Sequence, residues 1–315
     1  MKAIVISEFG NRSRLRFAEV PKPQPGEGEV LVRIKAAGVN PVDWKIREGL
    51  LDGFLPHQFP LIPGWDMAGV VEAVGHSARR FAKGDEVYGY CRRPVVQHGT
   101  YAEFIAVPES YLTLRPRNLS FEEAAAIPLA ALTAYQSLFD AAGLKRGQSV
   151  LVVGASGGVG SFAVQLAAAA GACVFAVASR ANHAYLRRLG AAKAFDYQQT
   201  GFGAAFRKAM PDGADVVFDC VGDDTFKMAQ ECVRKGGQLV SILEEMSEED
   251  ARQKGIGVHY VFVEPNVREL DHIRKLVEAG KVKVFLAGVH PLAQAAKAHE
   301  QMETGHTRGK IVLRM

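Results

Sequence analysis

Cysteine is scarce in this chain, with four residues among 315, and no two of them stand at the Cys-x-x-Cys spacing. Secreted chains that depend on disulfides place several cysteines close together, so a disulfide framework is not expected. We expect Cys91, Cys173, Cys220 and Cys232 to be free, mostly buried thiols in a protein of the reducing cytoplasm. The amino terminus agrees, because the apolar run in MKAIVISEFG is too short for a secretion signal.

Charge is absent between Gln148 and Ser179, where the chain has no Asp, Glu, Lys or Arg. A membrane-spanning helix needs about 20 apolar residues in unbroken helical geometry. Here four glycines fall between positions 154 and 160, with β-branched residues before them and an alanine-rich stretch after them. The segment therefore predicts a strand, a glycine turn, a helix and a second strand, and no membrane partner is expected.

A long basic tract interleaved with aromatic residues is also missing. The net charge is +4, and the basic residues occur in short separate clusters such as Arg187-Arg188. Such clusters are typical of solvated surfaces, whereas nucleic-acid-binding faces gather their charge into a patch or stripe. No nucleic-acid partner is expected.

The charge-free segment does contain a pattern typical of a phosphate-binding loop. Glycines let backbone N–H groups approach a pyrophosphate, and the start of the following helix favours its negative charge. The spacing Ala155-x-Gly157-x-x-Gly160 is the dinucleotide fingerprint with Ala in the first glycine position. We expect a dinucleotide to bind the loop residues Ala155, Ser156, Gly157, Gly158, Val159 and Gly160. The alternative is a glycine-rich turn that binds nothing.

A carboxylate is missing at the end of the second expected strand. A site specific for NAD has Asp or Glu there, which accepts a hydrogen bond from the ribose 2′-hydroxyl. This chain has Ser179 and Arg180 instead. A hydroxyl and a guanidinium suit a dianionic 2′-phosphate, so the sequence favours NADPH over NADH. Alternatively, Arg180 merely caps an exposed strand end.

The order of the expected elements predicts an α/β fold with two domains. The first third reads as short strands broken by Gly and Pro, which is typical of antiparallel, barrel-like structure. After the capping-box pattern Ser120-x-x-Glu123 and a helix kinked at Pro128, strands alternate with helices, as in a doubly wound Rossmann sheet. Strands are expected at 150–153, 173–178, 194–195, 215–219, 238–242 and 258–263. The expected domains are 1–118 with 264–315, and 119–263.

Several motifs, taken in order, resemble those of the medium-chain dehydrogenase/reductase family. They are AAGVNPVDWKIREG, FPLIPGWDMAGVVEAVG, GDEVYGY, GTYAEF, AAAIPLAALTAY, the glycine loop and GHTRGKIVL. The resemblance covers essentially the whole chain. It implies a GroES-like, β-barrel-type catalytic domain beside the Rossmann domain.

Zinc ligands are missing at the positions where zinc-dependent members of that family carry them. Those members use a Cys and the His of a Gly-His-Glu motif, and here the two positions hold Asn40 and Trp65. Neither side chain supplies the thiolate or imidazole that zinc prefers. His299, Glu303 and His306 lie near one end of the last helix, where a solvated helix face is favoured over a metal site. No metal is expected.

The zinc-free quinone oxidoreductase (zeta-crystallin-like) and alkenal/enone reductase branch is the part of the family that the chain resembles. The pattern of that branch appears as Asn40, Asp43, Arg47 and Gly49, but Leu50 and Leu51 follow where members often carry a Tyr. Asn40 is the first candidate for a polar contact with the substrate, because it stands where zinc-dependent members carry a metal ligand and its amide can donate. The resemblance implies that Thr133 lies beside the nicotinamide. Asp43 is a third candidate catalytic residue; it and Arg47 either line the cleft or form a structural ion pair.

Other residues receive cofactor or substrate roles from the same resemblance. Tyr197 matches a position that reaches the 2′-phosphate in related reductases, with packing as the alternative. Val221 and Leu243, at the ends of later strands, are expected near the ribose and the nicotinamide. Trp65 is either an apolar wall of the substrate pocket or part of the core.

The resulting functional expectation is a zinc-independent, NADPH-dependent reductase of quinones or α,β-unsaturated carbonyl compounds. These acceptors take hydride without a Lewis acid, and the protein must offer donors to the carbonyl oxygen. The alternatives are a reductase of simple aldehydes or ketones, and an NADPH-binding sensor or structural protein with little turnover. A homodimer is also expected, because in the family two Rossmann sheets often join through the last strand, here 258–263.

Overall fold

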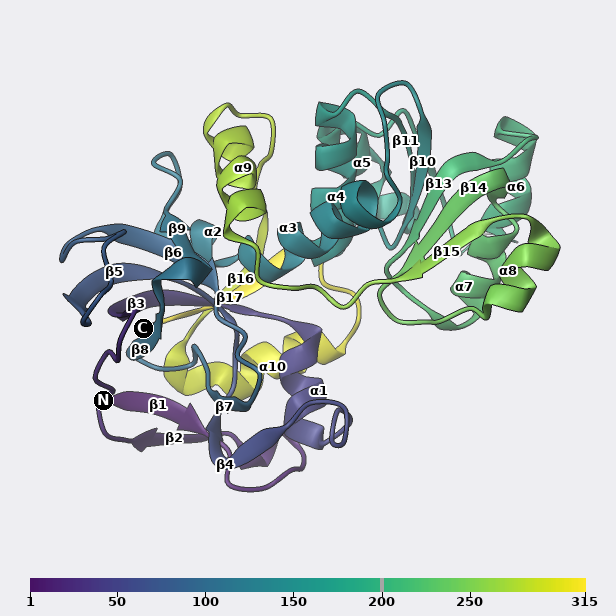
Figure 1. Ribbon diagram of the computed structural model, residues 1–315. Helices are drawn as coiled ribbons and strands as arrows, with labels where there is room; N and C mark the ends of the chain where they lie inside the picture. Colours follow the sequence, from purple (N-terminus) through teal and green to yellow (C-terminus); the bar gives the residue numbers. More distant parts are fainter. Residues whose placement is uncertain (199–200) are drawn as a thin grey trace. The chain divides into compact units, whose positions relative to one another are not determined.

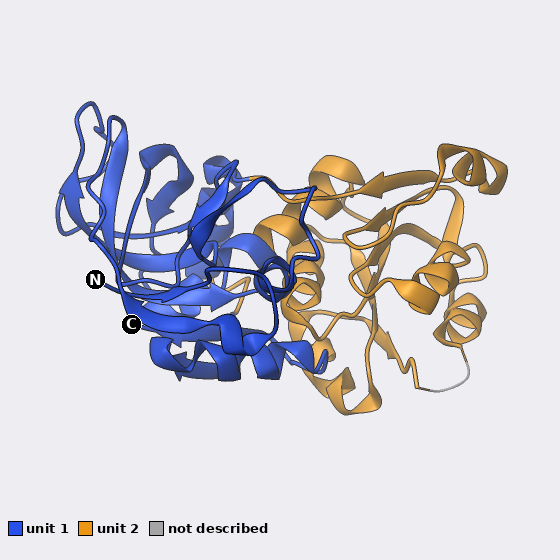
Figure 2. Ribbon diagram, turned by 90° about the horizontal axis from the view of Figure 1, so that it is seen from below, with its two compact units in different colours: residues 1–130, 265–279, 284–315 blue, residues 131–264, 280–283 orange. Residues whose placement is uncertain are grey.

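The computed structural model describes residues 1–198 and 201–315, which form two compact units (Figure 2). The first unit comprises Met1–Ala130, Pro265–Ala279 and Val284–Met315, and the second comprises Ala131–Glu264 and Gly280–Lys283. The sequence placed the first boundary after residue 118, whereas the first unit continues to Ala130. The reason is local packing, because helix α2 (Phe121–Ala125) lies against strands β3 (Glu29–Val39) and β5 (Asp66–Val74) of that unit.

The second unit is built on a six-stranded parallel sheet with the strand order β12-β11-β10-β13-β14-β15 (Figure 1). Numbered from β10, this is the order 3-2-1-4-5-6 of the Rossmann fold, so the predicted doubly wound sheet is confirmed. Its strands are β10 (Ser149–Val153), β11 (Cys173–Val177), β12 (Lys193–Phe195), β13 (Ala214–Asp219), β14 (Val233–Ser241) and β15 (Gly257–Tyr260). Its helices are α4 (Gly158–Ala169), α5 (His183–Leu189), α6 (Phe202–Ala209), α7 (Asp223–Gln230) and α8 (Glu248–Lys254).

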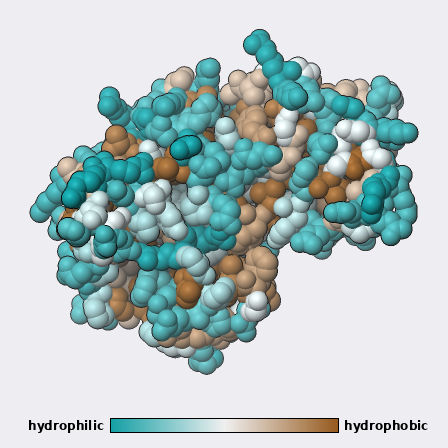
Figure 3. Space-filling view, in the orientation of Figure 1, coloured by the Kyte–Doolittle hydropathy of each residue, from teal (hydrophilic) through white to brown (hydrophobic). Residues whose placement is uncertain are grey.

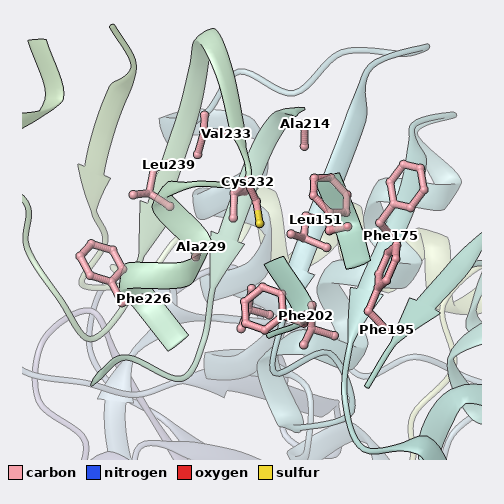
Figure 4. Packing of buried hydrophobic residues seen from close by; sticks show 14 residues of the cluster. Leu151, Phe175, Phe195, Phe202, Ala214, Phe226, Ala229, Cys232, Val233 and Leu239 are labelled. Atoms are coloured by element: carbon pink, nitrogen blue, oxygen red, sulfur yellow. The ribbon is translucent and has the colours of Figure 1, made fainter. Parts of the chain in front are cut away.

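The sheet is stabilised by apolar side chains on its faces. Every residue of β10 is buried, as the continuous β-branched run predicts for a central parallel strand. Figure 4 shows Phe175 and Phe195 in this core. Phe206 packs edge-to-face on both, and the ring centroids of Phe175 and Phe206 lie 5.5 Å apart.

The first unit contains a mixed, mainly antiparallel sheet in the order β16-β17-β3-β5-β6-β9, with β8 also paired to β3. Its remaining strands are β6 (Glu86–Tyr90), β8 (Phe104–Pro108), β9 (Leu112–Leu114), β16 (Leu286–Pro291) and β17 (Lys310–Arg314). Two smaller sheets pair β1 (Lys2–Val5) with β2 (Arg16–Glu19), and β4 (His57–Ile62) with β7 (Val96–His98). The helices are α1 (Pro41–Glu48), α2, α9 (Val267–Glu278) and α10 (Ala295–Glu303).

Around Pro128 the chain forms two helices instead of one kinked helix. The predicted capping box at Ser120 and Glu123 is confirmed, since each side chain accepts the other residue's backbone N–H. Helix α2 then ends at Ala125, and α3 (Pro128–Tyr135) begins at the proline. Proline lacks the N–H that a continuous helix needs but suits a first helical position, which explains the break.

The surface is largely hydrophilic on the face that Figure 3 shows, with small hydrophobic patches between the polar residues. All four cysteines are free; Cys91 and Cys232 are buried, Cys220 is half-buried and Cys173 is exposed. Within residues 1–198 and 201–315, no helix is long and apolar enough to cross a membrane. The charge-free segment is instead divided among β10, the glycine turn, α4 and β11.

Candidate active site

The expected cofactor residues follow the carboxyl ends of neighbouring parallel strands in the second unit. The glycine loop follows β10, and Ser179, Tyr197, Val221 and Leu243 follow β11, β12, β13 and β14. Because parallel strands end at the same edge of a sheet, these residues share the edge at which open α/β sheets bind ligands. Tyr197, Val221 and Leu243 are 40–42% exposed, so each presents apolar surface at this edge.

The glycine loop is built by close contacts that larger residues would prevent. Gly154 has a φ of +74°, and a Cβ atom on it would lie 2.7 Å from Val221 Cγ2. Gly160 lies in the first turn of α4, and its Cβ would lie 2.3 Å from the carbonyl oxygen of Gly154. Residues 156–159 are half-buried and Ala155 is fully buried. The loop therefore presents the backbone of Ser156, Gly157, Gly158 and Val159, with the start of α4, to a possible phosphate.

The end of β11 is tied to this loop by a side-chain amide. Asn182 Nδ2 donates to Ser179 Oγ at 3.1 Å and to Ser156 Oγ at 3.3 Å. Arg180, between Ser179 and Asn182, is exposed. No carboxylate stands at this strand end, as the sequence indicated. The geometry therefore joins a pyrophosphate-type loop to a hydroxyl and an exposed guanidinium.

A buried carboxylate holds the turn after β13. Asp219 accepts hydrogen bonds from the backbone N–H groups of Val221 and Gly222 and from Ser241 Oγ. Burial raises the pKa of Asp219, while these hydrogen bonds act in the opposite direction. Asp219 thus fixes Val221 beside the glycine loop, a role that sequence reasoning did not assign.

In the first unit, Asn40 belongs to a buried polar cluster at the start of α1. Its Nδ2 donates to Asp66 Oδ2 at 2.9 Å, and its Oδ1 accepts from Lys310 Nζ. The ammonium also donates to the Val39 carbonyl oxygen at 3.1 Å and lies 3.8 Å from Asp66 Oδ2. These contacts assign the amide orientation, because ammonium only donates and carboxylate here accepts. Asn40 is 1% exposed, so its amide is held rigidly.

A chain of hydrogen bonds begins next to this cluster and leads from Asp43 to Arg47. Arg47 Nη1 donates to His299 Nδ1 at 3.1 Å, so the imidazole Nε2 carries the hydrogen that faces the Tyr101 hydroxyl at 3.3 Å. Tyr101 in turn donates to Asp43 Oδ2 at 2.9 Å, which also accepts from the Asn40 N–H. The direction of every bond follows from the donor-only guanidinium at one end.

Burial shifts the pKa values of groups in the cluster at Asn40 and along the hydrogen bonds from Asp43 to Arg47. It raises the pKa of Asp43 to about 7 and that of Asp66 to about 6, and in Asp66 the Lys310 ammonium is the largest opposing effect. Burial also lowers the pKa of Lys310, and burial with the nearby Arg47 lowers that of His299 to about 3. The imidazole is therefore neutral at physiological pH, as the tautomer requires.

Two of the sequence interpretations need correction. Asp43 and Arg47 do not form an ion pair; within residues 1–198 and 201–315, Arg47 pairs with Glu48 and Glu303. His299 was placed on a solvated helix face, but it is fully buried between Arg47 and Tyr101. Helix α10 packs against α1 on the side that carries His299. His299 is therefore buried, although it lies among other polar residues of the helix.

Two further candidates are buried. Thr133, in α3, is 3% exposed, and its expected role beside a nicotinamide stays a prediction. Trp65 is 4% exposed and packs edge-to-face on Tyr90, with ring centroids 6.0 Å apart. Of its two interpretations, this packing favours the core.

Sequence reasoning missed Asp66, Tyr101 and Lys310 as members of the cluster. All three lie inside motifs that the sequence displays: GWDMAG, GTYAEF and GKIVL. The available signal was a charged residue at the start of an apolar strand, since Asp66 begins β5 and Lys310 begins β17. Isolated charges at such places are rarely buried without a partner.

Within the described part of the chain, no group of three or more His, Cys, Asp or Glu side chains is arranged to hold a metal ion. At the position of Asn40, the Lys310 ammonium already faces the amide and Asp66 oxygens. The donor set therefore does not fit a zinc ion.

Comparison with known proteins finds two matching families that together cover most of the chain. Residues 26–117 match the "Alcohol dehydrogenase GroES-like domain", and residues 189–313 match the family described as "Zinc-binding dehydrogenase". A chloroplast envelope quinone oxidoreductase homolog from Arabidopsis thaliana is 35% identical over 99% of this chain and 98% of its own length. The NADPH-dependent alkenal/one oxidoreductase of the same plant is 34% identical, over 99% and 79%.

The solved structures include a close match over the full length. The crystal structure of an NAD-dependent alcohol dehydrogenase covers 100% of both chains with a TM-score of 0.91 and 34% sequence identity. Its arrangement of strands and helices therefore agrees with the two units described above. On the matched families, the full-length relatives and this structural likeness, the chain belongs to the medium-chain dehydrogenase/reductase family.

Proposed function

We propose that this protein is an NADPH-dependent oxidoreductase that transfers hydride to a quinone or an α,β-unsaturated carbonyl compound without a catalytic metal. The observation that carries the proposal is the buried cluster at Asn40. A position that holds a metal ligand in zinc-dependent relatives carries here an amide fixed by Lys310 and Asp66. The named activities of the two plant relatives support the same acceptor classes.

The second unit supplies the cofactor part of the proposal. The backbone of residues 155–160 and the start of α4 would hold the pyrophosphate, and Ser179 and Arg180 would hold the 2′-phosphate. Val221 and Leu243, exposed at the same sheet edge, would contact the ribose and nicotinamide half. Bound NADPH supplies the hydride. Tyr197, Thr133 and the order of these contacts stay predictions.

The first unit supplies the polar contact for the acceptor. An enone takes hydride at its β-carbon and a proton at its α-carbon, with negative charge on the carbonyl oxygen in between. Asn40 Nδ2 bears two hydrogens and donates one to Asp66, so the second would donate to that oxygen once the acceptor reaches the buried amide. Lys310 withdraws charge through Oδ1 and strengthens the amide as a donor. Solvent supplies the proton that balances the reaction.

A direct test follows NADPH absorbance with purified, chelator-treated enzyme against quinones, enones, saturated aldehydes and ketones. We expect consumption with quinones or enones, and the same rate after zinc is added, because no described residue group fits a metal. Saturated carbonyls as the sole substrates would overturn the proposal in favour of the activity named in the structural match. NADPH binding without consumption across the panel would identify a binding protein with little turnover.

We further propose that two copies pair through β15 and that the protein works in the cytoplasm. Strand β15 ends the sheet order, and its Tyr260 is 40% exposed, so a second copy could continue the sheet across a twofold axis. Light scattering at micromolar concentration should give twice the 34.1 kDa chain mass, and a monomer contradicts the dimer.

The proposed cytoplasmic location is supported by Cys173, which is exposed as a free thiol and so fits a reducing compartment. Cell fractionation tests this location.

A further inference from the structure

A cavity lies at the outer edge of the parallel sheet in the second unit, beside the end of β11. Its volume is about 590 Å³, and its lining includes Arg180, His183, Arg187, Phe195 and Asp196. The cavity therefore stands where β11 and β12 end, next to the turn that carries Ser179 and Arg180. Cavities of this size are typical of small-molecule sites.

Helical spacing brings the basic side chains of the lining to one face. Arg187 follows His183 by four residues and Ala184 by three, so these residues share a face of α5. Ala184 is small and exposed, and it lines the same cavity. The neighbouring Arg188 is not part of the lining.

The lining of this cavity carries two guanidinium groups and one carboxylate. Arg180 and Arg187 are both exposed, and neither guanidinium forms an ion pair within residues 1–198 and 201–315. The lining contains one acid, Asp196, whose Oδ1 accepts the N–H of Gln198. Two unpaired guanidinium groups facing one cavity attract a dianion such as a phosphate monoester, which two arginines bind through several charge-assisted hydrogen bonds.

The cavity is also coupled to the glycine loop. Asn182 stands between Arg180 and α5, and its amide donates to both Ser179 Oγ and Ser156 Oγ. Arg180 directly follows Ser179, so a ligand with its pyrophosphate at the loop would carry a second phosphate near the Ser179 end of this link. NADPH has this arrangement of phosphates, and NADH lacks the second one.

We infer that Arg187 binds the 2′-phosphate of NADPH together with Arg180, so that α5 as well as the end of β11 determines cofactor specificity. The inference rests on the proposed function, in which NADPH is the cofactor. Arg187 lies seven residues beyond Arg180, on α5 and outside the strand-end pattern that predicts specificity, and the family resemblance assigned it no role.

The test measures dissociation constants of NADP⁺ and NAD⁺ by titration calorimetry, without turnover. Arg187→Ala should weaken NADP⁺ binding about tenfold, the effect of losing one charge-assisted hydrogen bond. NAD⁺ binding should change by less than about twofold, because NAD⁺ has no 2′-phosphate. Arg188→Ala is the matched control and should change neither constant, while Arg187→Lys should recover part of the NADP⁺ affinity.

The outcomes separate this inference from the cofactor proposal. A wild-type preference for NADP⁺ that Arg180→Ala reduces and Arg187→Ala leaves intact overturns the role of Arg187 while the proposed function stands. Equal weakening of NADP⁺ and NAD⁺ by Arg187→Ala also overturns it, since that result indicates a structural effect. If the wild-type protein binds NAD⁺ more tightly than NADP⁺, both the inference and the NADPH proposal are wrong.

Discussion

Replacing Lys310 with Met is expected to lower the free energy of unfolding by about 3–5 kcal/mol. Lys310 is 3% exposed, and its ammonium donates to Asn40 and to the Val39 carbonyl while facing the fully buried Asp66. Methionine fills a similar volume but leaves the Asp66 carboxylate buried beside no cation. Urea unfolding of the variant and the wild-type protein, followed by circular dichroism, measures the difference.

The loss of unfolding free energy in Lys310→Met should increase as the pH rises. Asp66 has a raised pKa of about 6 in the wild-type protein, where Lys310 acts to lower it, so removing Lys310 raises the pKa further. A carboxyl whose pKa is raised by folding contributes stability at low pH and loses it as the pH rises through the folded pKa. The variant should therefore be closest to the wild type near pH 5 and furthest from it near pH 8.

Arg314→Met provides the matched control on the same strand. Arg314 pairs with Glu122, but its side chain is 62% exposed, and such pairs contribute at most about 1 kcal/mol. If Lys310→Met proves as mild as this control, the ammonium does not neutralise Asp66 and the proposed polarisation of Asn40 loses its basis. The double variant Lys310→Met/Asp66→Asn should recover part of the lost stability, because it removes the unpaired charge.

The contrast between the two units explains how much the sequence could predict. The Rossmann sheet is encoded locally: β10, β11 and β13 are apolar runs bounded by glycine or polar residues, and their positions were predicted to within two residues. The polar clusters are encoded non-locally, since Asn40 meets Lys310 and Arg47 meets His299 across most of the chain. Spacing along a sequence does not reveal such pairs.

Helix α1 is a different case, because its boundaries are marked by local sequence signals. Asn40 precedes Pro41 at the first helical position, Asp43 accepts the Asn40 N–H, and Gly49 closes the helix with a φ of +80°. Proline at the start and glycine at the end are regular helix boundaries. Reading them would have placed Asn40 at a helix start, and Asp43 and Arg47 one turn apart on that helix, before any resemblance was considered.

Replacing Gly160 with Ala is expected to weaken NADPH binding by about 100-fold or more, and also to destabilise the second unit by about 1–3 kcal/mol. A Cβ at Gly160 would lie 2.3 Å from Gly154 O and 2.7 Å from Ala155 Cα, so the loop and α4 must separate. Because the backbone N–H groups that would hold the pyrophosphate lie on these two segments, separation removes at least two charge-assisted hydrogen bonds. Calorimetric titration with NADPH and urea unfolding measure the two effects.

Gly157→Ala separates the two roles of the loop glycines. A Cβ at Gly157 would meet nothing nearer than Gly154 O at 3.4 Å, and its φ of −72° suits alanine, so stability should be unchanged. The same methyl group would project where the pyrophosphate must approach the backbone, so NADPH binding should still weaken about tenfold. Wild-type affinity in Gly157→Ala would place the pyrophosphate elsewhere. Loss of affinity with intact stability would assign Gly157 to the cofactor and Gly160 to the packing of α4 on β10.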